Sequence, residues 1–226
     1  RSNEQQNGGN FRNRSTPLGD IANSSPVYVG AAVNYNYHQY NWPEASSYRA
    51  FVAAQRNRTP VIYVGANDGM LHAFSADSGS ELFAYVPRAM LTAEANLKQL
   101  SEPNVSGVVR KDYYVDGTSV TADVYINGQW RTILIGSAGR GGSHLFALDV
   151  TDPSQFDGSK LLWDRSFSQL GISTSKALIT RLNNGSWALV TGYGYNSSTG
   201  TVGLLVLDLA TGQPIVNGLE ASSSGD

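Results

Sequence analysis

The sequence predicts an all-β protein, a β-propeller in which small antiparallel sheets pack side by side around a common axis. Its composition is the first reason: glycine (24 residues) and tyrosine (12) are frequent among 226 residues, and only 15% are charged. Short β-rich apolar runs alternate with turn residues along most of the chain. Finally, one unit of strands and turns recurs, which is the sequence signature of a repeat architecture.

The clearest copy of this unit lies between Pro60 and Val86. Val61–Val64 and Leu71–Phe74 are apolar runs separated by Asn67-Asp68-Gly69, a turn whose residues tolerate positive φ. A second turn at Asp77-Ser78-Gly79 leads into a third run, Glu81–Val86. We therefore expect three consecutive antiparallel strands here.

Further strands of the same kind are expected before and after this copy. They are predicted at Val27–Gly30, Tyr113–Gly117, Ala122–Ile126, Gln129–Gly136, Leu145–Val150, Lys160–Trp163, Ile179–Asn183, Trp187–Gly192 and Leu204–Leu209. Asn127-Gly128 and Asn184-Gly185 each separate two such runs, and Asn-Gly is the strongest short-range hairpin signal. A tryptophan follows each turn glycine by two residues, which indicates that the same hairpin is repeated.

Each unit is a small sheet with two faces to cover, and radial packing of several units covers both. A two-sheet sandwich is the alternative, but it leaves the recurrence unexplained. We count three clear units and a partial first one, whereas closed propellers have about 4–8 blades. The prediction is an incomplete propeller over residues 17–216, with flexible segments at 1–16 and 217–226.

Two departures from the strand pattern are predicted. Arg88–Leu100 has helix-forming residues and an apolar stripe, so it is expected to be a short helical insertion. A shorter helix is expected at Ser47–Gln55.

The helix expected at Ser47–Gln55 follows a loop, Asn34–Tyr48, that is rich in aromatic residues. Bunched aromatic rings suit a recognition surface, because they provide contact area with few torsions to freeze. The alternative is a loop that folds its rings back onto the sheet. The candidate partner-binding residues are Tyr35, Tyr37, Tyr40 and Trp42.

The overall charge and composition exclude several classes of function. A formal net charge of −2 gives no electrostatic case for binding nucleic acid or an anionic membrane. No apolar run is long enough to cross a bilayer. The chain has no cysteine, so disulfides and thiolate metal sites are excluded. Because it begins at Arg1 without a signal peptide, we expect a fragment of a longer exported protein.

No catalytic or metal-binding residues are predicted. His38, His72 and His144 lack metal-ligand spacing, and the last two are interpreted as a repeat position. The glycine-dense stretch 136–142 matches neither a phosphate-binding loop nor a dinucleotide fingerprint, and a turn between strands is expected instead. Acidic residues recur at one place in each unit, which favours turn capping over catalysis. These residues are Asp77, Asp149 and Asp208.

The hairpin at 61–74 resembles the repeats of quinoprotein-type propellers, a generic likeness. A narrower resemblance covers most of the chain and rests on five blocks in a fixed order. They are Leu18–Gly30, the hairpin 61–74, Tyr113–Gly117, the stretch Leu134–Pro153 with its glycine-rich turn, and Trp187–Tyr195. In this order the blocks resemble the C-terminal propeller of the PilC/PilY family of type IV pilus tip adhesins.

This resemblance implies a non-enzymatic protein of the bacterial cell surface at the pilus tip, exported through the periplasm and associated with the outer membrane. It implies minor pilins as partners in pilus assembly and in opposing retraction, with roles in twitching motility and virulence. It also implies attachment to host cells or abiotic surfaces. Many members carry a calcium loop, but Asn67-Asp68-Gly69 and Asp157-Gly158 lack its alternating oxygen ligands. No cofactor is therefore expected in this chain, and calcium is expected only in the intact protein.

Two other functions stay open at this stage. A quinoprotein-like dehydrogenase would need a quinone, calcium ligands and a catalytic aspartate in a central funnel, and no convergent set is visible in the sequence. A periplasmic scaffold propeller of the outer-membrane assembly type would have no adhesive role.

Overall fold

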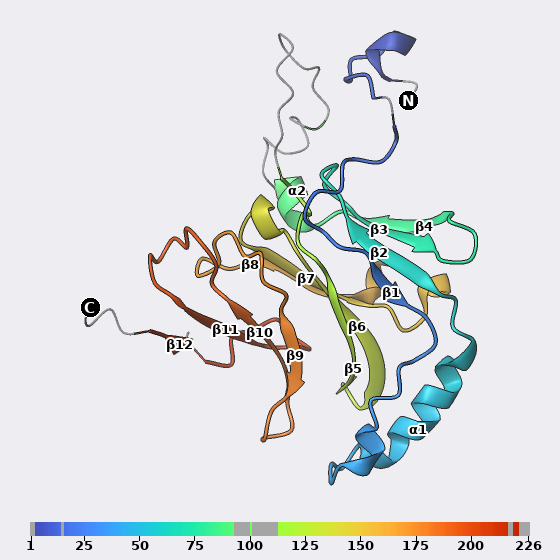
Figure 1. The fold of residues 1–226 in the computed structure, drawn as a ribbon, viewed down its shortest axis with the longest axis vertical. Helices are drawn as coiled ribbons and strands as arrows, with labels where there is room; N and C mark the ends of the chain where they lie inside the picture. Colours follow the sequence, from blue (N-terminus) through green and yellow to red (C-terminus); the bar gives the residue numbers. More distant parts are fainter. Residues whose placement is uncertain (1–2, 15, 93–99, 101–112, 217–218, 222–226) are drawn as a thin grey trace.

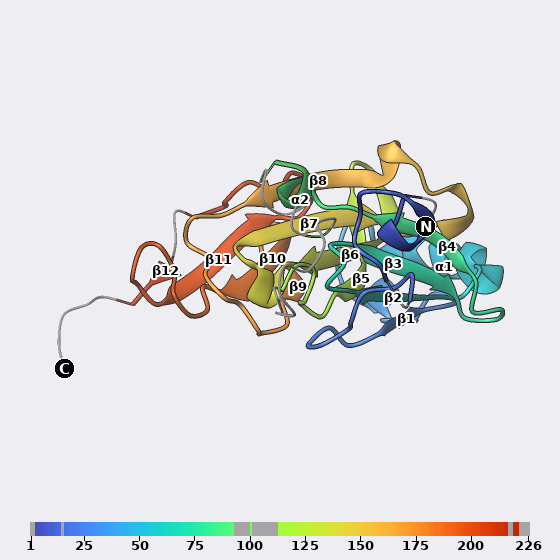
Figure 2. The ribbon, with the colours of Figure 1, turned by 90° about the horizontal axis from the view of Figure 1, so that it is seen from above.

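The computed structural model describes residues 3–14, 16–92, 100, 113–216 and 219–221. Its described strands form three sheets of four antiparallel strands each, which lie side by side (Figure 1). Seen from above, the sheets follow one another from β1–β4 on the right to β9–β12 on the left (Figure 2). In every sheet the spatial order of the strands is their order in the chain. The repeated antiparallel sheet of the predicted propeller is confirmed.

The first blade consists of β1 (Val27–Val29), β2 (Val61–Gly65), β3 (Leu71–Ser75) and β4 (Glu81–Tyr85). The second consists of β5 (Val120–Ile126), β6 (Gln129–Ser137), β7 (His144–Asp149) and β8 (Leu161–Ser166). The third consists of β9 (Leu178–Arg181), β10 (Trp187–Gly192), β11 (Gly203–Asp208) and β12 (Leu219–Glu220). The described helices are α1 (Ala45–Ala54), α2 (Arg88–Thr92) and the 3-10 turns at Gln5–Asn7, Tyr37–Gln39, Gln55–Asn57, Gly139–Gly141, Pro153–Gln155 and Gly158–Lys160.

Strand β1 corrects the predicted count of units. It pairs with β2 across a 31-residue connection, with Val27 opposite Tyr63 and Val29 opposite Val61. The strand predicted as a partial first unit therefore completes the first blade. The described residues contain three blades, and β12 lies in a stretch where no strand was predicted.

The first strand of each blade lies toward the common centre, because β5 contacts both β1 and β9. The core fills the two spaces between blades. Tyr63 and Leu71 of the first blade pack with Phe146 and Leu148 of the second. Leu145 and Ala147, the alternate residues of β7, belong to the cluster shared with the third blade. Every residue of β7 is buried, which explains its unbroken apolar run.

The third strand of each blade ends in a turn that its last side chain caps. Asp149 accepts a hydrogen bond from the Thr151 amide at 3.0 Å, and Asp208 accepts one from the Thr211 amide at 2.9 Å. In the first blade the equivalent residue is Ser75, whose hydroxyl accepts from the Ser78 amide at 3.2 Å. The capping role is confirmed for the two aspartates. The repeat position assigned to Asp77 was wrong, because Asp77 lies two residues beyond the end of β3.

The two Asn-Gly hairpins use different turns. Asn127 and Gly128 both have positive φ, 52° and 79°, which is the two-residue turn that suits a twisted hairpin. In the other hairpin only Gly185 has positive φ, and Leu182 and Ser186 close a longer loop. The expectation that both hairpins share one turn was therefore wrong in geometry, although a tryptophan follows each turn, Trp130 in one hairpin and Trp187 in the other.

We predict that Gly128→Ala lowers the free energy of unfolding by about 1 kcal/mol, because a side chain strains a left-handed backbone. No atom lies within 4 Å of the added Cβ, so the effect isolates backbone strain. Gly158→Ala is the matched control, since its Cβ also meets open space and its φ is not positive. Urea unfolding measures both variants, and equal stabilities would contradict the prediction.

The predicted strand Tyr113–Gly117 was wrong. Its backbone amides bond to the end of β6 instead, with Asp116 N–H donating to Ala138 and Gly117 N–H to Ser137. This segment crosses the glycine-rich turn so closely that a Cβ on Gly141 would lie 2.2 Å from the Tyr114 carbonyl oxygen. Gly139 and Gly141 therefore allow close backbone approach in the turn between β6 and β7, and the turn expected in this stretch is present.

The helix predicted at Ser47–Gln55 is confirmed by α1, which begins two residues earlier. The helical insertion begins at Arg88 as predicted, and α2 is described as far as Thr92. Its predicted continuation, 93–99, lies outside the described residues. No described helix has the length and apolarity that crossing a membrane requires.

Candidate partner-binding surface

The long connection between β1 and β2 carries the predicted aromatic loop and crosses from the first blade to the other two. In Figure 1, α1 lies beside the lower end of β5 and β6. Two contacts fix it there. Ser47 Oγ accepts a hydrogen bond from the Trp130 indole at 3.0 Å, and Glu44 forms an ion pair with Arg181 of β9 at 2.7 Å. Both side chains of this ion pair are largely buried. The connection belongs to the first blade and contacts β6 of the second and β9 of the third, so it joins all three blades.

Tyr37 lies at the centre of an aromatic cluster built on both hairpin tryptophans. Its ring centroid is 5.6 Å from that of Trp130, nearly parallel, and 5.5 Å from that of Trp187, edge to face. Tyr48 of α1 packs on Tyr37 at 4.9 Å and on Trp130 at 4.6 Å. Offset and edge-to-face contacts of this kind stabilise aromatic pairs beyond their buried area.

A second stack leads outward from this cluster. Tyr40 lies parallel to Trp42 with centroids 4.5 Å apart, and the Arg181 guanidinium lies 4.6 Å from the Trp42 ring centroid. The Arg181–Glu44 ion pair balances this cation. The Trp42 ring thus packs against the guanidinium of a neutralised ion pair.

The four candidate residues divide into two kinds. Tyr37 and Trp42 are half-buried and support the loop, whereas Tyr35 and Tyr40 are 38% and 54% exposed. Part of the loop folds back onto the sheets and part of it faces solvent, so each sequence-based alternative describes two of the four residues. We refer to Tyr35, Tyr37, Tyr40 and Trp42 together as the aromatic surface, and their role in binding a partner stays a prediction.

A buried acid holds the base of this surface. Asp123 of β5 is hydrogen bonded by the Tyr48 hydroxyl at 2.8 Å and by Thr132 Oγ1 at 2.7 Å. Burial raises the pKa of Asp123, and it outweighs the opposing effects of these bonds and of the Arg58 charge. Burial, together with the charge of Asp123, also raises the pKa of Tyr48. The residues therefore form a structural anchor for α1.

Comparison with known proteins shows the family. The model for the PilY1 beta-propeller domain matches residues 18–224. This chain belongs to that family. The expected resemblance is thereby confirmed.

Relatives in the PilY1 family are similar over almost the whole chain. A type IV pilus biogenesis factor PilY1 homolog of Xylella fastidiosa is 46% identical over 94% of this chain and 17% of its own length. The type IV pilus biogenesis factor PilY1 of Pseudomonas aeruginosa strain PAO1 is 46% identical over 92% of this chain and 18% of its own length. This chain therefore spans less than a fifth of these relatives.

A solved structure agrees with the family assignment. The crystal structure of the Pseudomonas aeruginosa PilY1 C-terminal domain covers 88% of this chain at 41% identity and a TM-score of 0.69. This chain covers 38% of that domain.

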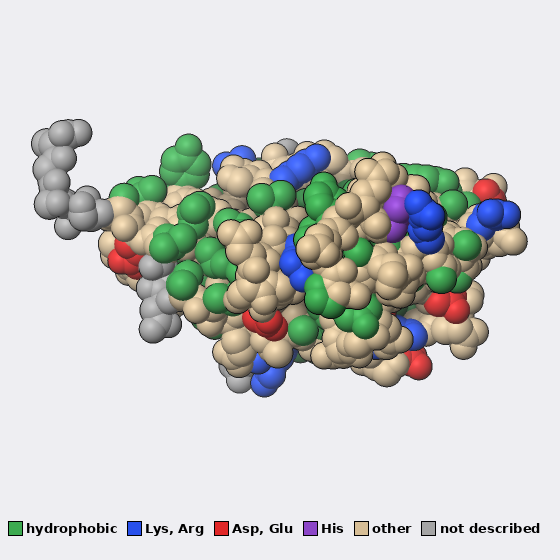
Figure 3. Space-filling view, turned by 90° about the horizontal axis from the view of Figure 1, so that it is seen from below, with side chains coloured by type: hydrophobic (Ala, Val, Ile, Leu, Met, Phe, Trp, Pro, Cys, Tyr) green, Lys and Arg blue, Asp and Glu red, His purple; other side chains and the backbone are tan. Residues whose placement is uncertain are grey.

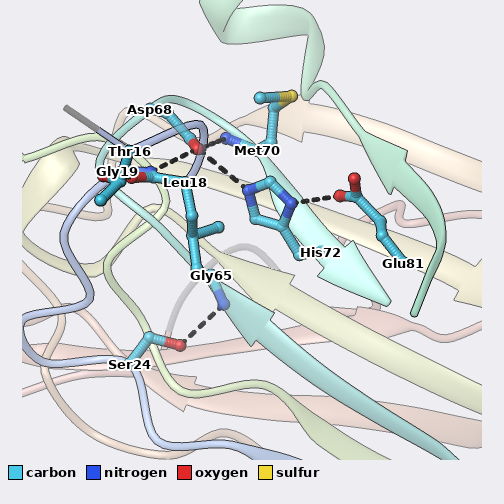
Figure 4. Close-up of polar contacts among 9 residues, drawn as sticks. All are labelled: Thr16, Leu18, Gly19, Ser24, Gly65, Asp68, Met70, His72 and Glu81. Atoms are coloured by element: carbon cyan, nitrogen blue, oxygen red, sulfur yellow. Dashed lines mark hydrogen bonds and ion pairs between the residues drawn. The ribbon is translucent and has the colours of Figure 1, made fainter. Parts of the chain in front are cut away.

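Residues 16–24, which we call the strap, contain the start of the first block, Leu18–Gly30, and cross the turn between β2 and β3. Figure 4 shows how it is held. Asp68 Oδ2 accepts a hydrogen bond from the Gly19 amide at 2.8 Å, and Ser24 Oγ accepts one from the Gly65 amide at 2.9 Å. Gly19 is needed at this crossing, since a Cβ there would lie 2.5 Å from the Asp68 nitrogen.

His72 fixes the acid that holds this strap, a role that sequence reasoning missed. Its Nε2 lies 3.1 Å from Asp68, and its Nδ1 lies 2.6 Å from Glu81 (Figure 4). Burial favours the neutral imidazole, but the hydrogen bonds that the ring donates to Asp68 and Glu81 outweigh it and raise the pKa of His72. Burial also acts against the charge of Asp68, but the bonds from His72 and Gly19 prevail and lower the pKa of Asp68.

His144 takes part in a different contact, between the first two blades. Asp164 of β8 bonds to both His144 and the Tyr85 hydroxyl, and it accepts from the Arg88 amide at 2.8 Å. Burial opposes the charge of Asp164, yet these bonds lower its pKa. The interpretation of His72 and His144 as one repeat position was wrong. His72 lies three residues before the capping Ser75, whereas His144 lies five before the equivalent Asp149.

The contact between His72 and Asp68 could not be recognised from their spacing in the sequence. His72 follows Asp68 by four residues across a tight turn, and only the hairpin geometry brings the two side chains together. Within the described ranges, no group of three or more histidine, aspartate or glutamate side chains is arranged to hold a metal ion.

Proposed function

We propose that this chain is a non-enzymatic recognition module within a type IV pilus biogenesis factor. The observation that carries the proposal is the PilY1 family match over residues 18–224, together with relatives named for type IV pilus biogenesis. The contacts described above support a role in binding. The titratable side chains that lie close together form hydrogen bonds and ion pairs that connect the blades, the strap and α1. On the predicted loop, the exposed side chains include the rings of Tyr35 and Tyr40.

The finer part of the proposal concerns place and partners. We expect the intact protein to be exported through the periplasm, to be associated with the outer membrane, and to act at the pilus tip. There it binds minor pilins, promotes extension, opposes retraction and attaches the cell to a host or abiotic surface. Twitching motility and virulence follow from pilus function, and calcium is expected to bind elsewhere in the intact protein.

The aromatic surface is the proposed contact with a partner. Tyr35 and Tyr40 are exposed, and their rings rest on Tyr37 and Trp42. A surface that is ordered before binding loses little conformational entropy on association. Exposed tyrosines on a rigid base are typical of the few residues that contribute most to an interface.

The test is co-purification of the intact protein with purified minor pilins. We expect wild type to retain the pilins, and the double variant Tyr35→Ala/Tyr40→Ala to bind at least about tenfold more weakly. Tyr195→Ala is the matched control, because Tyr195 is a tyrosine with a 74% exposed side chain on the third blade.

The two arms separate two failures. If wild type retains no minor pilin under conditions where pili assemble, the pilus assignment of this chain is overturned. If wild type and the double variant bind equally well, the pilus assignment stands and the aromatic surface loses its role.

A further inference from the structure

We infer that the aromatic surface and the carboxamides beside it form a binding site for uncharged saccharides. This inference rests on the proposed role of the surface in attachment and names the class of ligand. It is carried by the exposed rings, the neutral polar side chains between them, and the rigidity of the loop. None of these residues has a catalytic or metal-binding role in the description above.

The chemistry of the loop is uncharged throughout. Between residues 34 and 43 there is no aspartate, glutamate, lysine or arginine, and four of the ten side chains are carboxamides. These are Asn34, Asn36, Gln39 and Asn41, all exposed. The nearest ionic pair, Glu44 with Arg181, is largely buried and internally neutralised. An ionic ligand would therefore meet no free counter-charge on the loop itself.

Carboxamides and sugar hydroxyls match each other. Each carboxamide offers two N–H donors and a carbonyl acceptor, and neighbouring sugar hydroxyls donate and accept in alternation. Within the described part of the chain, the side chains of Asn36, Gln39 and Asn41 have no hydrogen-bond partner, so they are available to a ligand. Asn34 is used in part, since its Oδ1 accepts from the Asn36 amide at 2.9 Å.

The exposed rings provide the second half of a saccharide site. The face of an aromatic ring carries negative charge density, and the axial C–H bonds of a pyranose carry a small positive charge, so the two pack together. Tyr40 rests on Trp42, and Tyr35 on Tyr37 with centroids 5.3 Å apart. In the sequence of the loop, the two exposed tyrosines lie on either side of Asn36 and Gln39.

The loop is fixed before any ligand arrives. Asn36 adopts a left-handed conformation with φ 58°, and it begins the 3-10 turn Tyr37–Gln39. The Tyr35 amide donates to the Tyr48 hydroxyl at 3.4 Å, and that hydroxyl lies 2.9 Å from the Val33 carbonyl oxygen. The face seen from below carries several groups of hydrophobic side chains, with lysine, arginine, aspartate and glutamate side chains scattered among them (Figure 3).

One further detail points to an unfilled polar contact. The Trp187 indole N–H, although buried beneath the aromatic cluster, has no hydrogen-bond partner among the described residues. The Nδ1 atom of His38, inside the loop, is likewise buried and unpaired there. Buried polar atoms are rarely left without a partner in native proteins. Each of these two atoms, one on β10 and one in the loop, is a position where a bound water or a ligand hydroxyl would complete the structure.

The experiment measures binding of neutral pentasaccharides to the intact protein. The probes are cellopentaose, mannopentaose and N-acetylchitopentaose, with a heparin pentasaccharide as the anionic comparison and decaproline as the peptide comparison. Saturation-transfer NMR reports binding, and tryptophan fluorescence reports its place, because Trp42 lies directly beneath Tyr40. The variants are Tyr35→Ala, Tyr40→Ala and the control Tyr195→Ala.

We expect at least one neutral pentasaccharide to bind, and its affinity to fall about tenfold or more in Tyr35→Ala and Tyr40→Ala but not in Tyr195→Ala. Gln39→Ala and Asn41→Ala are expected to weaken binding without changing the fold, as judged by circular dichroism, because neither residue has a left-handed backbone. Three results would overturn the inference: binding of no neutral probe, binding that all variants retain, or a preference for heparin or decaproline.

The pilin co-purification distinguishes this inference from the proposed function. If the tyrosine variants lose minor pilins while no neutral saccharide binds wild type, the surface is a protein contact and the saccharide inference fails. If the saccharide binds and pilin retention is unchanged in the variants, the saccharide inference holds and the surface has no role in retaining pilins.

Discussion

Trp130→Ala is expected to lower the free energy of unfolding by about 3–5 kcal/mol. The side chain is 7% exposed and packs against Tyr37, Tyr48 and Trp187. Its indole N–H also holds the start of α1 through Ser47 Oγ. Truncation removes the ring that the connection between β1 and β2 rests on, and leaves a cavity that this rigid cluster fills poorly.

Urea unfolding followed by circular dichroism measures this loss, and Trp130→Phe separates its parts. Phenylalanine keeps most of the packing but lacks the N–H donor, so its cost is expected to be well below that of alanine. Tyr195→Ala should change stability by no more than about 0.5 kcal/mol, as exposed sites usually do. A loss below about 1 kcal/mol for Trp130→Ala would show that α1 is held by other contacts.

The second large effect is expected at the strap. Asp68→Ala should cost about 3 kcal/mol at pH 6, because it leaves buried His72 without one of its two carboxylates and frees the Gly19 and Met70 amides. The strap, residues 16–24, should then exchange its amide hydrogens faster. Hydrogen exchange read by mass spectrometry reports this directly, and unchanged protection of the strap would contradict the assignment of Asp68 as its anchor.

The pH dependence of this contact has a definite sign. The pKa of His72 is raised in the folded chain, so its contribution is complete below about pH 6.5, the value of a free histidine, and is lost as the pH rises through the folded pKa. The pKa of Asp68 is lowered, so its contribution is complete above about pH 3.8 and is lost as the pH falls through the folded value. The strap is therefore most firmly held between about pH 4 and pH 6.5.

A double-mutant cycle between Asp68→Ala and His72→Gln isolates the pair. The coupling free energy is expected to be largest near pH 5.5 and to decline toward pH 9. Asp157→Ala serves as a control for acidic residues in general, since Asp157 is on the surface and bonds only within its own turn at Ser159. A coupling that stays constant across this range would mean that His72 does not titrate between pH 5.5 and pH 9, which contradicts the prediction.

The strand pattern was predictable because each blade is local. Apolar runs such as Leu145–Leu148, bounded by turn residues, specify a buried strand from its own sequence. Gly128 and Asn127 likewise specify their turn without help from the rest of the chain. The same local rules misplaced the strand at Tyr113–Gly117, whose amides bond to the carbonyl oxygens of Ser137 and Ala138, 20 to 22 residues away.

The candidate site was predictable only in part. Four aromatic residues in one loop indicated a surface, but the division between supporting and exposed rings depends on Trp130 and Trp187, two residues of other blades. The His72 anchor was not predictable either, because a histidine four residues after an aspartate has many interpretations until the hairpin orients them. In both cases the missing information is which distant elements lie together.

The ion pair between Glu44 and Arg181 joins residues that are 137 positions apart in the chain. During synthesis, the segment between β1 and β2 therefore emerges long before the strand that it finally contacts. Contacts at such separation slow folding, because the intervening chain must be ordered before they form. The connection between β1 and β2 is therefore expected to reach its final position only after β9 has been made, and until then its aromatic rings remain exposed to chaperones and to neighbouring chains.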